Sequence, residues 1–486
     1  MLTVKPVQKY DCDVLIAGGG PAGSGLAFHL AGKGYKVIVA DAETFPRDKV
    51  CGDGVSPIAL AELQHMGITQ TENFAKANEI KQVGLFIKND KVIINLTKPD
   101  HLPFHARIIP RIELDHWIYN AARSVSATYI ESARVTGFTI KPGVAIAELK
   151  QGQKQFSIRA KMIVGADGSS STIARQMNGH SPDNEFQLLG LRSYYEDVNG
   201  PTDRVDIYFS EESFPGIFWM FPKGPAAANI GMAMVSKTLP TKPSRVKELL
   251  INHIHHNKDI RERIGEGKMA GKIQGWPITF YNSKSKITGQ RIALVGDAAG
   301  LINPLSGDGI QYALLSARWA SETIIQCLQT NDFSEQALYA YRKKVDAELG
   351  YDFALSNLLV QFPRNKTFSK LWMTILEVMI ARAKEDKIYA AIIAGIFEGT
   401  YPSYKALNAS FILKSLKQGA NELGNSLTKT ISKPEAIINN GLQFSGNMVT
   451  MLSELNTYQK DHINWLKKTV GKTISLAGHV MQNIRN

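Results

Sequence analysis

Asp13-Val-Leu-Ile-Ala-Gly18-Gly-Gly20-Pro21-Ala22-Gly23 is the stretch of sequence that decides the fold. Its apolar run, Val14 to Ala17, predicts a buried parallel strand, because it is short and bounded by glycines. A helix over Ser24–Ala31 and a second strand over Lys36–Ala40 follow, and Asp41 ends the second strand. A strand, a glycine turn, a helix and a second strand with a terminal acid predict a βαβ unit that binds a dinucleotide.

The residues of this turn have separate tasks in such a unit. The first glycine permits the tight turn, the second lets the backbone approach a pyrophosphate, and the third lets helix and strand pack closely. The start of the helix presents unpaired N–H groups to the phosphates, and Asp41 can accept hydrogen bonds from a ribose. The alternative, a glycine-rich turn without a ligand, does not explain the position of Asp41. We therefore expect cofactor contacts from Gly18, Gly20, Pro21, Ala22 and Gly23.

A second glycine-rich stretch, Val295-Gly296-Asp297-Ala-Ala-Gly300, continues as Leu-Ile-Asn-Pro304-Leu-Ser-Gly307-Asp308-Gly309-Ile310. Together, in this order, the two stretches are typical of the two ends of one FAD site, so we expect FAD as the cofactor. The second stretch follows a strand and precedes a helix, whose N-terminus would stabilise the negative charge of a reduced flavin. Ordinary turn chemistry is the alternative for Gly307 and Gly309. The Gly-Asp pair at the strand end argues against it.

Between these stretches, Phe45-Pro-Arg47-Asp-Lys49-Val-Cys51-Gly52-Asp-Gly54 completes a pattern that resembles the geranylgeranyl reductase family. That family belongs to the flavoproteins of the para-hydroxybenzoate-hydroxylase fold type and is related to flavin-dependent halogenases. The resemblance runs from about residue 11 to about residue 350, and it includes Arg111-x-x-Leu-Asp115 and Gly165-Ala-Asp167-Gly168. The family usually has Glu in place of Asp41 and of Asp308, and both changes preserve the charge.

The resemblance implies further contacts with FAD. Asp297 would hydrogen-bond the ribityl chain, and Gly309 and Ile310 would face the pyrimidine edge of the flavin. Val135 would lie near the adenine, while Asp167 and its neighbour would brace the pyrophosphate. The residues expected to bind FAD beyond the first turn are Asp41, Arg47, Cys51, Gly52, Gly54, Arg111, Val135, Asp167, Gly168, Asp297, Pro304, Gly307, Gly309 and Ile310.

Cys51 is the candidate catalytic residue, because the family places its loop beside the isoalloxazine ring. A thiol there could orient the flavin or donate a proton to a substrate carbanion. The alternative is a small packing residue, since free cysteines are often simply buried.

A candidate substrate segment runs from Gly216 to Gly224 and is followed by Asn229-Ile-Gly231-Met-Ala233. It resembles the family's aromatic-x-Trp-x-Phe-Pro motif with a later Gly-x-Gly. Ile217 and Ala233 depart from that pattern, which indicates a pocket reshaped for a different substrate; a plain sheet core is the alternative. We expect Met232 or Met234 in the pocket wall. The expected substrate contacts are Ile217, Trp219, Phe221, Pro222 and Gly231.

The fold class that follows is α/β (α+β), with a Rossmann-like FAD-binding domain, an inserted antiparallel sheet for the substrate and a C-terminal helical region. We expect a discontinuous FAD-binding domain over 1–75, 105–185 and 290–350. Alternating apolar and polar positions predict the antiparallel sheet over 76–104 and 186–289. Residues 351–486 read as helical.

Composition narrows the setting of the protein. The 486 residues carry three cysteines with no pairing or metal spacing, so we expect a reducing cytoplasm and no metal. No apolar run reaches the ~18 residues of a membrane span. The net charge of +12 suits an anionic partner or a solvated surface; nucleic acid is not expected. Basic amphipathic stretches at 411–416 and 462–468 leave two uses open, peripheral contact with the inner face of a membrane or packing on the protein.

The function expected first is an FAD-dependent oxidoreductase that reduces C=C bonds of an isoprenoid or similar apolar lipid, by hydride transfer from reduced flavin. No second dinucleotide motif is present, so NAD(P)H would bind transiently or a ferredoxin-like redox partner would donate electrons. A monooxygenase (hydroxylase) or halogenase acting on an aromatic or natural-product substrate is an alternative. The segment at 216–222 lacks the first Trp and the Ile of the halogenase signature. A non-catalytic electron-transfer flavoprotein is the third reading.

Overall fold

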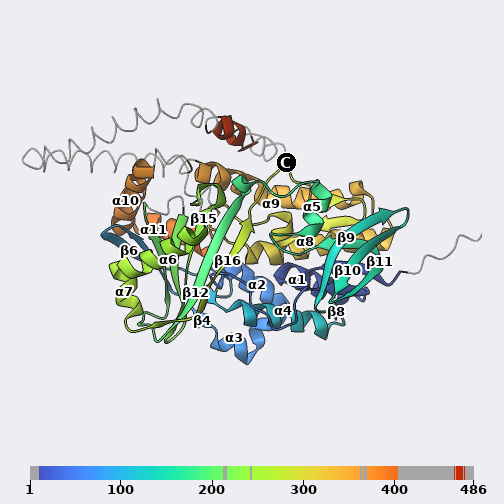
Figure 1. Cartoon of the computed structure of the whole chain (residues 1–486), viewed down its shortest axis with the longest axis horizontal. Helices are drawn as coiled ribbons and strands as arrows, with labels where there is room; N and C mark the ends of the chain where they lie inside the picture. Colours follow the sequence, from blue (N-terminus) through green and yellow to red (C-terminus); the bar gives the residue numbers. More distant parts are fainter. Residues whose placement is uncertain are drawn as a thin grey trace, which may run out of the picture.

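The computed structural model describes residues 10–211, 216–240, 243–361, 364, 369–402, 465, 467–473 and 475–476. The stretch 411–416, named above as a candidate membrane contact, lies outside the described residues, as does most of 462–468. The two larger sheets lie on opposite sides of the folded molecule, and helices pack around each of them (Figure 1).

The first sheet has a parallel core that the glycine turn predicts. Its path runs β17-β18-β11-β1-β2-β8, and all neighbours except β17 and β18 pair in parallel. The strands are β1 (Cys12–Ala17), β2 (Val37–Ala40), β8 (Thr128–Ile130), β11 (Lys154–Gly165), β17 (Thr288–Gly289) and β18 (Ile292–Leu294). Apolar side chains of β1, of β18 and of residues 158–164 of β11 are almost fully buried, as parallel strands covered on both faces require. The expected Rossmann-like α/β fold is therefore confirmed.

Helices from distant parts of the chain cover this sheet. They are α1 (Pro21–Ala31), α4 (Arg111–Ser124), α8 (Ile310–Thr330) and α9 (Glu335–Gln361). The antiparallel strands β9 (Ala133–Lys141) and β10 (Val144–Gln151) extend β11, and α5 (Thr172–Asn178) follows it. The expected boundary at residue 350 falls inside α9. Leu349 and Phe353, on either side of it, are both buried in the core of the first sheet.

The second sheet has seven strands in the order β16-β12-β15-β14-β13-β5-β6. They are β5 (Gln82–Ile87), β6 (Asp90–Asn95), β12 (Gln187–Glu196), β13 (Arg204–Phe209), β14 (Gly216–Gly224), β15 (Ala227–Val235) and β16 (Lys268–Thr279). The expectation of an antiparallel sheet holds for every pair except β5 and β13, which are parallel. These two strands come from separate insertions, so no tight hairpin forces them to run in opposite directions.

Short elements connect the two sheets. The strands β3 (Gly54–Val55), β4 (Asn78–Glu79) and β7 (Arg107–Ile108) form a small sheet of their own. The helices α2 (Pro57–His65) and α3 (Glu72–Lys76) lie beside it in the sequence. The loop that carries Cys51 therefore enters β3 on its way from the first sheet to the second.

Helices also cover the faces of the second sheet. α6 (Pro243–His256) and α7 (Lys258–Ile264) interrupt the expected run of strands. α10 (Ser369–Glu385) and α11 (Lys387–Glu398) confirm the helical pattern past residue 351 and pack against β5 and β6 through residues such as Ile380 and Ile393. None of the described helices is long and apolar enough to cross a membrane.

Candidate functional site

The glycine turn has room for backbone only. Gly18 has a φ of +99°, and a Cβ there would lie 2.4 Å from the carbonyl oxygen of Ala166. A Cβ on Gly23 would lie 1.9 Å from the carbonyl oxygen of Gly18. Gly20 precedes α1 as its N-cap, and no side chain among the described residues caps the helix there. The N-terminus of α1 therefore keeps N–H groups for an anionic ligand, as a dinucleotide cofactor requires.

The two glycine-rich stretches meet in space. Gly296, with a φ of +57°, lies so close to α1 that a Cβ would come within 2.7 Å of the Cβ of Ala22. Further along, Gly25 of α1 lies against Ala317 and Leu314 of α8. The close packing brings the N-terminal parts of both helices to one side of the first sheet. This cradle fits an extended dinucleotide such as FAD, since its narrow points are lined by glycine.

An ion-pair cluster lies beside the turn. Asp41 accepts a 2.6 Å hydrogen bond from the N–H of Gly19, and its carboxylate lies 3.6 Å from Arg47. Arg47 also donates to Asp115 at 3.0 Å, and Arg111 donates to both oxygens of Asp115 at 2.7 and 2.8 Å. Burial opposes ionisation of Asp115, but Arg111 and Arg47 hold its pKa below the usual range. This cluster ties the start of α4 to the turn.

Asp167, Gly168 and Val135 lie on the elements that surround the turn. The carboxylate of Asp167 accepts hydrogen bonds from Ser171 and from the N–H of Thr172, so it caps α5. Its Cα lies 2.9 Å from the position that a Cβ on Gly18 would take. Val135 is buried near the start of β9, two residues after Ala133, whose N–H donates to the carbonyl oxygen of Asp41.

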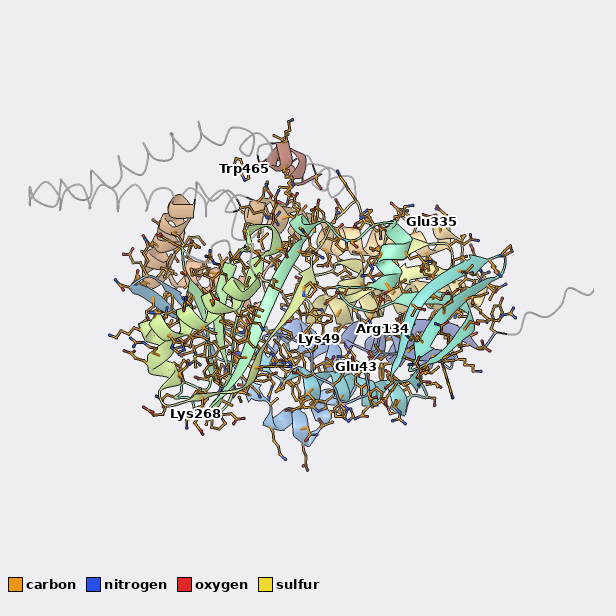
Figure 2. The ribbon with its side chains drawn as sticks, in the orientation of Figure 1. Glu43, Lys49, Arg134, Lys268, Glu335 and Trp465 are labelled. Atoms are coloured by element: carbon orange, nitrogen blue, oxygen red, sulfur yellow. The ribbon has the colours of Figure 1, made fainter. Side chains whose placement is uncertain are left out.

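The second stretch places Asp297 opposite the Cys51 loop. One oxygen of Asp297 accepts hydrogen bonds from Lys49 and from Ser169, both at 3.2 Å. Lys49 lies near the middle of the molecule (Figure 2).

Gly309 is the N-cap of α8, again without a side-chain cap among the described residues. Ile310 begins the helix, and Pro304 is buried in the preceding loop. Gly307, at φ +71°, has open space where a Cβ would be.

The Cys51 loop lies directly against the aromatic strand β14. A Cβ on Gly52 would lie 3.1 Å from Cε2 of Phe221 and 3.5 Å from Nε1 of Trp219. Gly54 faces the same Phe221 ring at 3.8 Å. On the next strand, a Cβ on Gly231 would lie 2.2 Å from Cζ2 of Trp219. The indole of Trp219 therefore packs directly on Gly231, where no side chain would fit. The candidate catalytic loop and the candidate substrate strand are in contact.

Strand alternation corrects the expectation for the methionines. Trp219 pairs with Gly231, whereas Phe218 pairs with Met232. Met232 and Met234 are buried with Phe218 in the cluster beneath α6, on the face away from Trp219. Neither methionine can line a pocket with the indole, because alternate residues of a strand point to opposite faces.

On the face that carries Trp219, Ile217 and Phe221 are partly buried and pack against the cluster that contains α10 and α11. Pro222 is buried, and its carbonyl oxygen accepts a 2.7 Å hydrogen bond from Asn78.

A polar network that the sequence did not reveal holds the loop and the sheet together. Asp53 is fully buried and accepts 2.8 Å hydrogen bonds from Tyr194 of β12 and Asn229 of β15. Asn229 also donates to the carbonyl oxygen of Cys51 at 2.7 Å and accepts from Trp219 at 3.0 Å. Asp53 and Asn229 both stand inside motifs quoted above. Only their position between two sheets shows that they form one site.

Burial shapes the chemistry of both acidic groups in the loop. It raises the pKa of Asp53 to about 6, against the opposing hydrogen bonds from Asn229 and Tyr194. Burial also raises the pKa of the Cys51 thiol, and Asp53 adds to this effect while Arg111 opposes it. Cys51 is therefore a protonated thiol at neutral pH. In the described part of the chain, no group of three or more His, Cys, Asp or Glu could hold a metal.

Comparison with known proteins adds to this geometry. Residues 11–345 match the family described as FAD binding domain. A menaquinone reductase of Mycolicibacterium smegmatis is 29% identical over 318 residues, which cover 64% of this chain and 75% of that protein. A digeranylgeranylglycerophospholipid reductase of Thermoplasma acidophilum is 27% identical over 339 residues, covering 68% and 83%. A geranylgeranyl bacteriochlorophyll reductase-like protein of Thermoplasma acidophilum has a similar structure, with a TM-score of 0.69 at 21% identity, over 89% of this chain and 98% of that one.

Proposed function

This chain belongs to the family described as FAD binding domain, and we propose that it is a geranylgeranyl reductase-like enzyme that reduces C=C bonds of an isoprenoid or similarly apolar lipid. The observation that carries the proposal is the packing of the Cys51 loop on Trp219 and Phe221. A protonated thiol in a loop that packs on an aromatic strand, next to a dinucleotide cradle, suits the reduction of an apolar substrate. The names of the two reductases among the relatives support the same class.

The protein's own contribution is alignment, exclusion of water and a proton. FAD, when bound and reduced, would supply the hydride for one alkene carbon. Cys51 holds a proton at Sγ for the other carbon, since its raised pKa keeps the thiol neutral. Arg111, whose charge lowers the pKa of Cys51, stabilises the thiolate that remains until water returns the proton. Trp219 and Phe221 hold the chain away from solvent.

The electron donor is part of the proposal. Over one cycle the substrate gains two hydrogens, so an external reductant must supply two electrons and restore the reduced cofactor. We propose NAD(P)H or a small ferredoxin-like protein for this step. Anaerobic mixing of the FAD-loaded protein with each donor, followed by the bleaching of flavin absorbance, distinguishes the two.

One experiment tests the reaction itself. The FAD-loaded protein is reduced without oxygen and offered polyprenyl phosphates, quinones and aromatic acids, and flavin reoxidation and product masses are followed. We expect reoxidation by a polyprenyl substrate, with a gain of two hydrogens for each reduced bond. Cys51→Ser is expected to retain FAD and lose turnover. If an oxygenated or halogenated aromatic product forms, and only in air, the protein is a monooxygenase or halogenase and the reductase proposal is wrong. If the reduced protein passes electrons only to quinone, it is an electron-transfer flavoprotein.

A further inference from the structure

Asp53 has an unusual position for a charged residue. Its φ is +65°, a left-handed conformation that few residues other than glycine adopt, and its side chain is fully buried. Its carbonyl oxygen accepts a hydrogen bond from Ile109 at 2.9 Å, and its Oδ1 accepts one from the N–H of Arg111 at 3.3 Å. The backbone and half of the carboxylate therefore fix Asp53 to the start of α4.

The other carboxylate oxygen reaches across to the second sheet. Oδ2 accepts from the hydroxyl of Tyr194 and from the amide of Asn229, both at 2.8 Å. The second amide hydrogen of Asn229 goes to the carbonyl oxygen of Cys51, and its Oδ1 accepts from Trp219. Both N–H groups and the oxygen of the Asn229 side chain are thus bonded, and each bond joins the Cys51 loop or the aromatic strand.

A second attachment lies on the other side of Cys51. Arg192 of β12 donates to the carboxylate of Asp48, and its guanidinium lies 4.1 Å from the ring centre of Tyr194. The ammonium of Lys223 lies 3.9 Å from the same ring centre. The loop is therefore attached to the sheet at Asp48 and at Asp53, and Cys51 lies between the two attachments.

We propose that Asp53 is a positioning residue, which holds the Cys51 loop on the second sheet by acting through Asn229 and Tyr194. It thereby fixes the Cys51 side chain, which packs against the buried cluster of α2, α4 and α8. The carboxylate accepts the two sheet donors through Oδ2 and the N–H of Arg111 through Oδ1. An amide in its place would present an NH2 group to one of these donors. The inference rests on the proposed function in one respect only, that Cys51 has a chemical role.

The test measures the thiol directly and needs no substrate. The apo and FAD-loaded proteins are treated with iodoacetamide over a range of pH, and alkylation of each cysteine is followed by peptide mass spectrometry. Cys12 and Cys327, both buried, serve as references within the same molecule. The charged groups that act on the Cys51 thiol are Asp53, which raises its pKa, and Arg111, which lowers it.

For Asp53→Asn, we expect alkylation of Cys51 at pH 8 to accelerate about tenfold, because loss of the Asp53 charge lowers the pKa of the thiol and increases its thiolate fraction. The pH midpoint of its alkylation should move down, while those of Cys12 and Cys327 stay. Tyr194→Phe removes one of the two sheet donors and should give a smaller acceleration, because the thiol becomes more accessible. The matched control is Tyr281→Phe, which removes an equally short bond from Tyr281 to Asp346 and should leave Cys51 unchanged.

The proposal is overturned if Cys51 reacts at the wild-type rate and midpoint in a folded Asp53→Asn protein. Should that variant not fold, an unchanged rate in Tyr194→Phe overturns it equally. A protein that reduces no polyprenyl substrate but still shows the Cys51 shift refutes the proposed function and leaves the positioning role in place.

Discussion

Two buried aspartates, Asp115 and Asp53, lie on either side of Arg111 and behave in opposite ways. Neither has any exposed surface. Asp115 receives two hydrogen bonds from the Arg111 guanidinium and one from Arg47, and its pKa falls below the usual range. Asp53 receives the neutral donors of Tyr194 and Asn229, and burial raises its pKa to about 6.

The difference shows that burial alone does not set the charge of an acid; the charge of its hydrogen-bond donors decides the outcome. Guanidinium groups compensate for the loss of water around Asp115, whereas amide and hydroxyl dipoles compensate only in part around Asp53. The first cluster fastens the candidate cofactor turn as a permanent ion pair. The second joins the two sheets through a carboxyl group that can gain a proton near pH 6.

Removing the cation should have the largest effect. Arg111→Ala leaves Asp115 buried with Arg47 as its remaining cation, and we expect a loss of about 3 to 5 kcal/mol in the free energy of unfolding. The variant should also bind FAD more weakly. Urea denaturation and FAD titration measure both. Lys344→Ala is the control, because its pair with Glu348 is exposed, with side chains 45% and 47% accessible, and should contribute no more than about 1 kcal/mol. Equal losses of unfolding free energy in the two variants would contradict the distinction between a buried and an exposed ion pair.

The pH dependence of stability comes next. The pKa of Asp53 is raised from 3.8 to about 6 on folding, so the folded state binds its proton more tightly. Protonated Asp53 therefore stabilises the folded state below pH 4. This stabilisation, roughly 3 kcal/mol of the free energy of unfolding at most, is lost as the pH rises through 6. Asp53→Asn should lack this decline. Unfolding curves at pH values between 4 and 7 test it, and parallel curves for wild type and variant would contradict the raised pKa.

A smaller change removes one neutral donor. Tyr194→Phe should cost about 1 to 2 kcal/mol at pH 7, because one hydrogen bond to an ionised carboxylate is lost. It should also raise the pKa of Asp53 further, so the decline in stability would move to higher pH. The denaturation midpoint at two pH values measures both effects. A variant as stable as the wild type, with an unchanged pH profile, would show that Tyr194 does not act on Asp53.

The smallest effect is expected at Lys49. Its pair with Asp297 is partly exposed, with side chains 23% and 20% accessible. Lys49→Gln should therefore change the free energy of unfolding by less than about 1 kcal/mol, and less still at high salt. Thermal denaturation at low and high salt measures it. A loss comparable to that of Arg111→Ala would show that the ion pair belongs with the buried cluster.

The candidate site divides into what patterns could predict and what they could not. The glycines at 18 and 23 were predictable, because a close approach of backbone to backbone leaves few alternatives to glycine. Asp53 was not, since an aspartate in a loop is ordinary until its side chain is found buried. The methionine expectation was wrong because it ignored the two-residue alternation of a strand.

Sequence by itself determined the cofactor class and the first sheet, because both depend on local rules: glycine geometry, the βαβ spacing and continuous apolar strands. Tertiary structure alone decided that Gly296 packs on Ala22, that the Cys51 loop lies on Trp219 and that Asn229 connects them. These contacts join residues far apart in the chain. Their energies come from burial and from the pairing of polar groups, which no local pattern encodes.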